Sequence, residues 1–170
     1  MNFRTAQYDD FTTIAHLHTT SWQHHYRGFM PDDFLDNELI ANRLEVWQKR
    51  LAQPTENQYI ILAEIQNEVV GFCCAYANAH PQWGTYIDNL HVLPHFKAKG
   101  IGRRLMQQIA DWSTAIYHQP NIHLHCIADN RPARGFYEKV GGVCQEVFKE
   151  TLLGGKTLDV CRYVWPNFNG

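Results

Sequence analysis

Between Asn89 and Met106, the sequence NLHVLPHFKAKGIGRRLM places two glycines and four cations at the start of an expected helix. Backbone N–H groups at a helix start have no intrahelical partner and carry partial positive charge, so they suit an anion. Gly100 and Gly102 lack the Cβ atoms that would hold a phosphate away from these groups. The cations are Lys97, Lys99, Arg103 and Arg104. The pattern predicts a phosphate or pyrophosphate site, the structural alternative being a plain turn with solvated cations.

Two other phosphate-binding motifs do not fit this segment. A Walker A loop, Gly-x-x-x-x-Gly-Lys-Ser/Thr, is absent, so hydrolysis of a nucleoside triphosphate is poorly supported. The dinucleotide motif Gly-x-Gly-x-x-Gly fails because its last glycine would fall at Leu105.

The segment VLPHFKAKGIGRRLM resembles the coenzyme-A-binding motif of the GNAT superfamily of N-acetyltransferases, Gln/Arg-x-x-Gly-x-Gly/Ala preceded by Val-x-Pro. Lys97 stands at the Gln/Arg position, which keeps the charge of arginine but not its geometry. Downstream, NRPARGFYEKVG resembles a second family motif, Asn-x-x-Ala-x-x-Phe-Tyr-x-x-x-Gly. Its matching positions are Asn130, Ala133, Phe136, Tyr137 and Gly141. The two motifs occur in the family's order, and the resemblance spans roughly residues 59–164.

This resemblance implies a mixed sheet that is splayed into a V between its fourth and fifth strands, with coenzyme A in the cleft. The backbone of Leu90, His91 and Val92 would hold the pantetheine arm and the acetyl carbonyl. The turn that would grip the pyrophosphate consists of Lys97, Ala98, Lys99, Gly100, Ile101, Gly102 and Arg103. Asn130 would cap the last helix, contact the cofactor, or do both.

The resemblance also assigns a general acid. Acetyl transfer to an amine needs a neutral amine, a stabilised oxyanion and a proton for the departing thiolate. Tyr137 matches the family tyrosine that protonates the sulfur and would also contact the cofactor. The alternative is an ordinary half-buried tyrosine that packs beside Phe136.

The general base is less clearly marked by the sequence. His125 lies five residues before Asn130, where some ribosomal-protein acetyltransferases of the family carry a glutamate. A histidine titrates near neutral pH and could accept a proton directly or through water. Asp88 is the second candidate, on the strand where Tyr86 stands at a position often occupied by a family glutamate. A packed strand histidine and a strand-end carboxylate are the structural alternatives.

The amine acceptor is expected on the N-terminal side, around SWQHHYRGFMPDDFLD. Trp22, Tyr26 and Phe29, together with Phe34, could wall a pocket. Three carboxylates nearby could attract a cation, namely Asp32, Asp33 and Asp36. Since helix starts favour aspartate whatever the substrate, this segment does not identify the amine.

Metal and nucleic acid are not expected as partners. His123 and His125 form a His-x-His pair of the kind that binds zinc, but no third ligand stands at a suitable spacing. The basic patch at 97–104 is short and lacks interleaved aromatics, and the formal net charge of the chain is −2.

The elements that must position these residues follow from the periodicity. Helices are expected from Asp9 or Asp10 to residue 22, with an Asp as N-cap, and at 32–53, 101–117 and 130–141. Strands are expected at 58–65, 69–77, 85–92, 121–128, 144–153 and 156–165. The strand–helix–strand unit at 85–128 requires parallel pairing, whereas the hairpins are antiparallel.

Composition and length agree with an ordinary globular domain. The 170 residues are 45% hydrophobic and 19% charged, and five cysteines without a Cys-x-x-Cys pair indicate buried thiols in a reducing compartment. No signal peptide and no apolar run of transmembrane length is visible, so a cytoplasmic protein with no membrane partner is expected.

The sequence therefore predicts an α+β fold with a mixed, mostly antiparallel sheet flanked by helices. We expect one acetyltransferase domain over residues 1–170, with a helical acceptor side at 1–55 and a sheet and CoA-binding core at 56–170. The predicted activity is transfer of acetyl from acetyl-CoA to a primary amine of a small molecule or a protein N-terminus. A noncatalytic acyl-CoA-binding or sensor module is the alternative, and the apolar strand at 157–165 suggests pairing between two copies as a homodimer.

Overall fold

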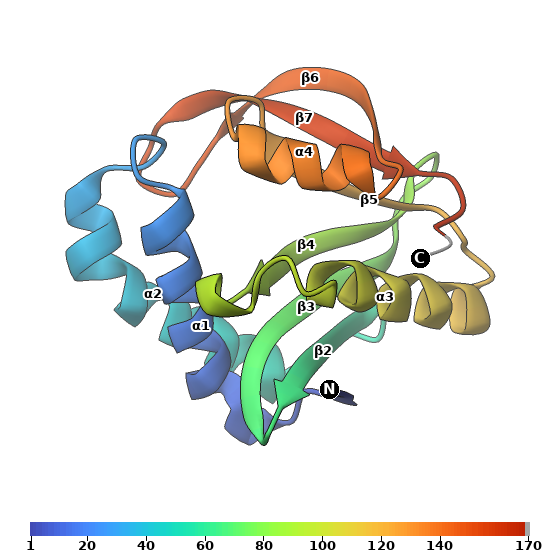
Figure 1. The fold of residues 1–170 in the computed structure, drawn as a ribbon, viewed down its shortest axis with the longest axis horizontal. Coiled ribbons are helices and arrows are strands. Elements are labelled where there is room, and N and C mark those ends of the chain that lie inside the picture. The colour runs from blue at the N-terminus through green and yellow to red at the C-terminus, as the bar shows by residue number, and fades with distance from the viewer. Residues whose placement is uncertain (169–170) are drawn as a thin grey trace.

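The computed structural model describes residues 1–168, in which seven strands form one sheet with the order β1-β2-β3-β4-β5-β7-β6 (Figure 1). The strands are β1 (Asn2–Thr5), β2 (Gln58–Ile65), β3 (Glu68–His80), β4 (Gly84–Val92), β5 (Ile122–Ile127), β6 (Val143–Thr151) and β7 (Thr157–Trp165). The α-helices are α1 (Phe11–His25), α2 (Leu39–Ala52), α3 (Ile101–Tyr117) and α4 (Arg131–Lys139). Only β4 and β5 pair in parallel, which confirms the mixed, mostly antiparallel sheet.

The N-terminal strand β1 was not predicted, because four residues are too short to show a period. It pairs with β2, and Arg4 joins it to two neighbouring segments through ion pairs with Asp10 at 2.7 Å and Glu64 at 2.6 Å. Asp10 occupies the expected N-cap position of α1 but makes no capping hydrogen bond there, because its carboxylate bonds to Arg4 and to the backbone N–H of Gln7.

The second predicted helix contains a change of helical type. Residues Phe34–Glu38 form a π-helical turn, in which the N–H of Leu39 bonds to the carbonyl of Phe34, and α2 continues from Leu39. This turn buries Leu35 and Leu39 fully, together with Met30, in a small apolar cluster below the end of α1. The sequence period located the helix but gave no sign of the wider turn.

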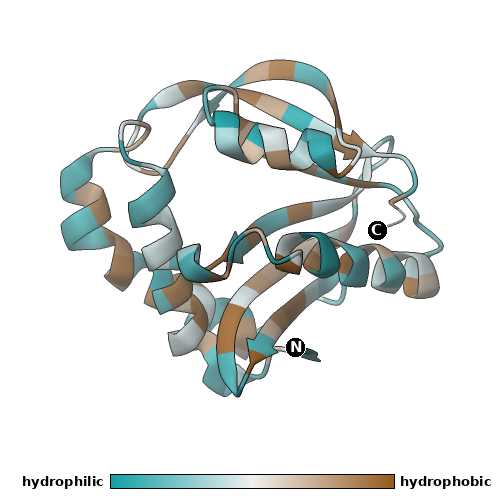
Figure 2. Ribbon diagram, viewed as in Figure 1, coloured by the Kyte–Doolittle hydropathy of each residue, from teal (hydrophilic) through white to brown (hydrophobic). Residues whose placement is uncertain are grey.

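Strand alternation explains why helices cover both faces of the sheet. In β2, Ile61 and Ala63 belong to the core under α3, whereas Ile60 and Leu62 belong to the core under α1 and α2. Both faces of β2 and β3 are therefore apolar, and these strands are predominantly hydrophobic in Figure 2. None of the helices within residues 1–168 combines the length and the apolar character needed to cross a membrane.

The sheet opens between β4 and β5, as the family resemblance implied. The two strands pair only at Thr85–Ile122, Tyr86–His123 and Ile87–Leu124. Beyond Ile87, β4 remains paired with β3, and β5 remains paired with β7. Figure 1 shows the resulting two halves, with α3 on one and α4 on the other.

A β-bulge lies at the point of separation. Cys74 pairs with Asn89 and Ala75 pairs with Ile87, so Asp88 is the extra residue of β4. Bulges bend a strand and raise its local twist, which turns the end of β4 away from β5.

The suggestion that the strand at 157–165 pairs between two copies is wrong for this strand. β7 is paired with β5 on one side and with β6 on the other, so both of its backbone edges are used within the chain. The free edge on this side of the described sheet belongs to β6, whose side chains are largely exposed.

Candidate functional site

Two cavities lie where the halves of the sheet part. The larger has a volume of about 490 Å³ and is lined by the end of α1, the end of β4, the segment from Phe96 to Gly102, and α4. The smaller has a volume of about 70 Å³ and lies among α1, β4, β5 and α4. Four residues line both cavities: Tyr26, Leu90, His91 and Tyr137.

The turn before α3 has the backbone geometry expected of an anion cradle. Ala98 has φ +59° and Gly100 has φ +76°, so both residues turn in the left-handed region immediately before the helix begins. A Cβ on Gly100 would meet nothing within 4 Å, and Gly100 lines the larger cavity. A substituent there would therefore enter space that a ligand could use.

Gly102 has a packing role that the sequence did not indicate. A Cβ at this position would lie 3.1 Å from the ring of Phe136, so the glycine allows α3 to approach α4. The ring of Phe136 therefore restricts the size of the side chain at this position, and Gly102 also lines the larger cavity.

The predicted cofactor residues are mostly brought together. Those that line the larger cavity are Leu90, His91, Val92, Lys97, Ala98, Gly100, Ile101, Gly102, Asn130 and Tyr137. Lys99 and Arg103 do not line it; the ammonium of Lys99 lies 4.9 Å from the ring centre of Phe96. Arg104 lies against Phe3 instead. Lys139 lines the cavity and was not predicted, because nothing in its local sequence distinguishes it from a surface lysine.

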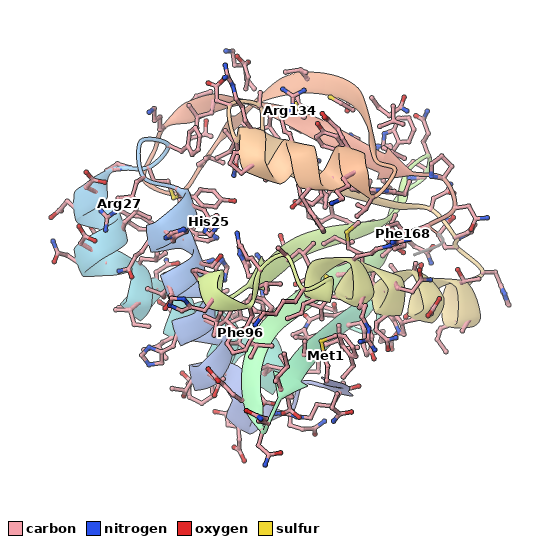
Figure 3. All side chains as sticks on the ribbon, viewed as in Figure 1. Met1, His25, Arg27, Phe96, Arg134 and Phe168 are labelled. Carbon is pink, nitrogen blue, oxygen red and sulfur yellow. The ribbon has the colours of Figure 1, made fainter. Side chains whose placement is uncertain are left out.

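Lys97 contacts α1 across the larger cavity. Its ammonium donates to Nε2 of His25, and His25 Nδ1 donates to the carbonyl of Ser21 at 2.7 Å. Burial lowers the pKa of both His25 and Lys97. Figure 3 labels His25 at the end of α1 and Phe96 in the facing segment. The contact links the turn before α3, which is the predicted phosphate site, to the end of α1. The local sequence could not reveal this link.

Tyr137 is held by α4. Asn130 caps this helix, since its Oδ1 accepts from the N–H of Ala133 at 3.2 Å, and Tyr137 follows two turns later. The ring packs against Tyr163 and Trp165, with centroid distances of 5.6 and 5.9 Å. Burial raises the pKa of Tyr137 well above its usual value, so the phenol keeps its proton at neutral pH.

His125 lines the smaller cavity and is paired with a residue that the sequence did not indicate. Its Nδ1 lies 3.2 Å from Oε2 of Glu150 on β6, while its Nε2 is buried without a hydrogen-bond partner among the described residues. The pairing lowers the pKa of Glu150. A carboxylate next to Nδ1 favours the proton on that nitrogen, which leaves Nε2 as an acceptor.

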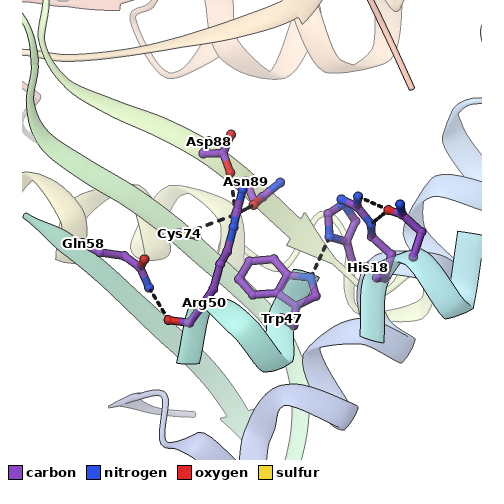
Figure 4. Close-up of polar contacts among 9 residues, drawn as sticks. His18, Trp47, Arg50, Gln58, Cys74, Asp88 and Asn89 are labelled. Carbon is purple, nitrogen blue, oxygen red and sulfur yellow. Dashed lines mark hydrogen bonds and ion pairs between the residues drawn. The ribbon is translucent and has the colours of Figure 1, made fainter. Parts of the chain in front are cut away.

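Asp88 also lines the smaller cavity, but its carboxylate is occupied. Arg50 Nη1 lies 2.6 Å from Asp88 Oδ2 and 3.0 Å from Asn89 Oδ1. Figure 4 draws both contacts. The guanidinium also lies 5.0 Å from the ring centre of Trp47. Asp88 is therefore better suited to fixing the bulge than to accepting a proton.

On the predicted acceptor side, Trp22 and Tyr26 line the smaller cavity, and Phe29 lines neither cavity. The rings of Trp22 and Tyr26 are stacked with a centroid distance of 5.0 Å. Each carboxylate of the expected acidic cluster has a local partner: Asp32 and Asp36 form ion pairs with Arg27, and Asp33 accepts from Asn37.

The partly buried His91, which lines both cavities, packs against the fully buried His18. His91 Nδ1 lies 2.9 Å from Ser21 Oγ, and the rings of His91 and His18 are 4.5 Å apart. His18 Nδ1 accepts from Trp47 Nε1 at 3.1 Å. Burial lowers the pKa of His91 to about 3 and that of His18 well below its usual value. Both imidazoles are therefore neutral at pH 7.

The His-x-His pair on β5 is divided between different partners. His123 Nδ1 lies 3.1 Å from the carbonyl of Trp83, and the ring centres of His123 and His125 are 6.3 Å apart. Across residues 1–168, no group of three or more His, Cys, Asp or Glu side chains is arranged to hold a metal ion.

Comparisons with known proteins place these features in a family. Residues 11–142 match the model of the acetyltransferase (GNAT) family. A probable N-acetyltransferase from Mycobacterium tuberculosis is 28% identical over 176 aligned positions, which cover 100% of this chain and 87% of the relative.

Solved structures share the fold at low identity. The PaiA N-acetyltransferase from Thermoplasma acidophilum, in complex with coenzyme A, superposes with a TM-score of 0.77 at 16% identity and covers 96% of each chain. A chimera of the spermidine N-acetyltransferase SpeG from Vibrio cholerae gives a TM-score of 0.67 at 18% identity, covering 96% of this chain and 94% of the other.

The buried histidines predict a fall in stability on mild acidification. Unfolded histidines bind protons below about pH 6.5, whereas His91 in the folded state binds one only near pH 3. Between these pH values, the unfolded state holds more protons, so the free energy of unfolding decreases as pH falls. The slope is at most about 1.4 kcal/mol per pH unit for each such histidine.

Urea denaturation at pH 7.5, 6.5 and 5.5 measures this decrease, and His91→Gln should reduce the slope by the contribution of one histidine. The imidazole NMR signals of His91 report its protonation in the folded protein. Titration of this ring near pH 6.5 would contradict the prediction.

Proposed function

Because the chain belongs to the acetyltransferase (GNAT) family, we propose that it transfers the acetyl group of acetyl-CoA to a primary amine within a ternary complex. One observation carries the proposal: Tyr137, which keeps its proton at neutral pH, lines both the larger and the smaller cavity. A proton donor on the common wall can serve a reaction between two molecules bound on either side.

The larger cavity fits coenzyme A. Its volume of about 490 Å³ is in the range of ligand pockets. The left-handed turns at Ala98 and Gly100 and the start of α3 suit the pyrophosphate, and Lys97 and Lys139 add positive charge. The end of β4, which has no ladder partner on the β5 side, suits the amide-containing pantetheine arm.

The smaller cavity would receive the amine. Bound acetyl-CoA supplies an activated thioester, whose carbonyl carbon the amine nitrogen attacks. The C–N bond forms and the C–S bond breaks. Nε2 of His125, buried without a partner, takes the proton released by the amine. Glu150 is a positioning residue that holds Nδ1 of His125, and the Oη of Tyr137 gives a proton to the departing sulfur. Asp88 is not assigned as base, because Arg50 holds it.

We also propose that residues 1–55 form the acceptor side of a single domain. Their contribution to the smaller cavity comes through Trp22 and Tyr26. The alternative of a noncatalytic acyl-CoA-binding module would be favoured by an acceptor cavity plugged with aromatic side chains. The smaller cavity instead has a free volume of about 70 Å³ and is lined by His125 and Tyr137, which favours catalysis.

Gly100→Val should weaken coenzyme A binding by at least about tenfold, which is about 1.4 kcal/mol. The side chain would enter the larger cavity beside the expected pyrophosphate. Gly155→Val is the matched control, because Gly155 has φ +83°, also has nothing within 4 Å, and lines neither cavity. Calorimetry with coenzyme A measures both; equal affinity of folded Gly100→Val and wild type would refute the assignment.

Tyr137→Phe should lower kcat by about a hundredfold, the lower end of general acid contributions, because a thiolate is already a fair leaving group. Acetyl-CoA affinity and thermal stability should change little, since the ring remains. Tyr163→Phe is the control: it removes a neighbouring phenol that lines neither cavity. Wild-type turnover by Tyr137→Phe, with chemistry shown to be rate-limiting, would leave Tyr137 as a packing residue only.

His125→Gln should lower kcat/KM by about a hundredfold at pH 7. The loss should shrink as pH rises toward the pKa of the amine, because a deprotonated acceptor depends less on a base. Glu150→Gln should give a smaller loss with the same pH trend. His123→Gln, on the same strand but outside both cavities, should show no such trend. A pH-independent loss in His125→Gln would argue for a packing role.

A further inference from the structure

The smaller cavity limits what the acceptor can be. Its volume of about 70 Å³ is well below the roughly 300–1,000 Å³ of pockets that enclose a drug-sized ligand. It holds the reacting amine and the atoms next to it. The residues that line the smaller cavity should therefore select the acceptor by the chemical group next to its reacting amine.

Two buried polar atoms belonging to lining residues have no partner among the described residues. One is Nε1 of Trp22, and the other is Nε2 of His125. An indole N–H can only donate, so it requires an oxygen or another acceptor. A buried donor left unpaired is unfavourable by about 1–3 kcal/mol, so an unpaired donor on a residue that lines a cavity indicates a ligand group that satisfies it.

Charges of both signs surround the cavity. Asp88 is the carboxylate among the lining residues, and Arg50 already neutralises it at 2.6 Å. Arg43 lies 5.1 Å from the ring centre of Trp22, is 7% exposed, and hydrogen bonds to the side chain of Asn42. No carboxylate within residues 1–168 forms an ion pair with it. Arg43 therefore places positive charge beside Trp22, whereas the Glu150 carboxylate lies 3.2 Å from Nδ1 of His125. This arrangement suits an acceptor with its amine near His125 and a negative group near Trp22.

We propose that the acceptor is a compact primary amine that carries an oxygen acceptor, preferably a carboxylate, within a few bonds of the nitrogen. Trp22 Nε1 donates to that oxygen, and His125 Nε2 accepts from the amine. This inference rests on the proposed acetyl transfer and narrows its substrate class away from polyamines.

Initial rates with a matched panel test the proposal. The panel is β-alanine, 3-aminopropan-1-ol, n-butylamine and spermidine, each assayed by release of free thiol from acetyl-CoA. We expect kcat/KM to be highest for β-alanine, then for the amino alcohol, with each at least tenfold above n-butylamine and spermidine. The highest value for spermidine or n-butylamine would overturn the proposal.

Trp22→Phe isolates the indole N–H because it keeps an aromatic ring. It should reduce the ratio of kcat/KM between β-alanine and n-butylamine at least tenfold. Trp112→Phe is the matched control: Trp112 is also half-buried and stacks on Tyr59 at 5.0 Å, but it lies on α3 and lines neither cavity. An unchanged ratio in Trp22→Phe would overturn the role of the indole.

A binding measurement separates this inference from the proposed function. The indole N–H signal of Trp22, identified among five tryptophans by its loss in Trp22→Phe, should shift when β-alanine is added to the protein with coenzyme A. n-Butylamine should not shift it. A β-alanine shift without acetylation of any amine supports the predicted contact with Trp22 but refutes the proposed transfer. Acetylation without a shift or a preference for oxygen refutes the inference alone.

Discussion

The separation of β4 from β5 is the constraint on which the rest of the site depends. Three residue pairs join the strands, and the bulge at Asp88 then turns β4 away. The opening leaves one backbone edge of β4 without a ladder partner and creates room for the end of α1, the turn at 97–102 and α4 to approach it. Arg50 holds the bulge through Asp88 and Asn89, so a contact from α2 supports the geometry at the opening.

Several polar groups around the opening carry no free charge. Asp88 is paired, burial keeps His18 and His91 neutral, and Tyr137 remains protonated. Burial also raises the pKa of Cys74 and Cys126 to about 12, and neither thiol lines a cavity. A covalent acyl-cysteine intermediate would need a thiolate nucleophile. Because these two thiols stay protonated and lie outside the cavities, direct transfer of the acetyl group from acetyl-CoA to the amine is favoured in the proposed reaction.

Features carried by consecutive residues could be predicted from the sequence. The turn at Gly100, the cap at Asn130 and the parallel unit ending in β5 were each read from local spacing or a motif. Glu150 could not be found in this way, because only the pairing of β6 with β7 places it beside His125. The contact between His25 and Lys97 likewise joins segments 72 residues apart. The packing role of Gly102 could not be predicted either, since the close approach of Phe136 is a tertiary contact.

The division of residues between the two cavities has an evolutionary consequence under the proposed function. Trp22 and His125 line only the smaller cavity, Lys97 and Gly100 line only the larger one, and Tyr26 lines both. After a gene duplication, exchanges at Trp22 could redirect one copy to a new amine while its use of the acetyl donor is inherited unchanged. An exchange at Tyr26 would disturb both partners at once. Amine selectivity should therefore diverge among descendants through positions such as Trp22, which line only the smaller cavity. Tyr26, which lines both cavities, should remain as a shared ancestral residue.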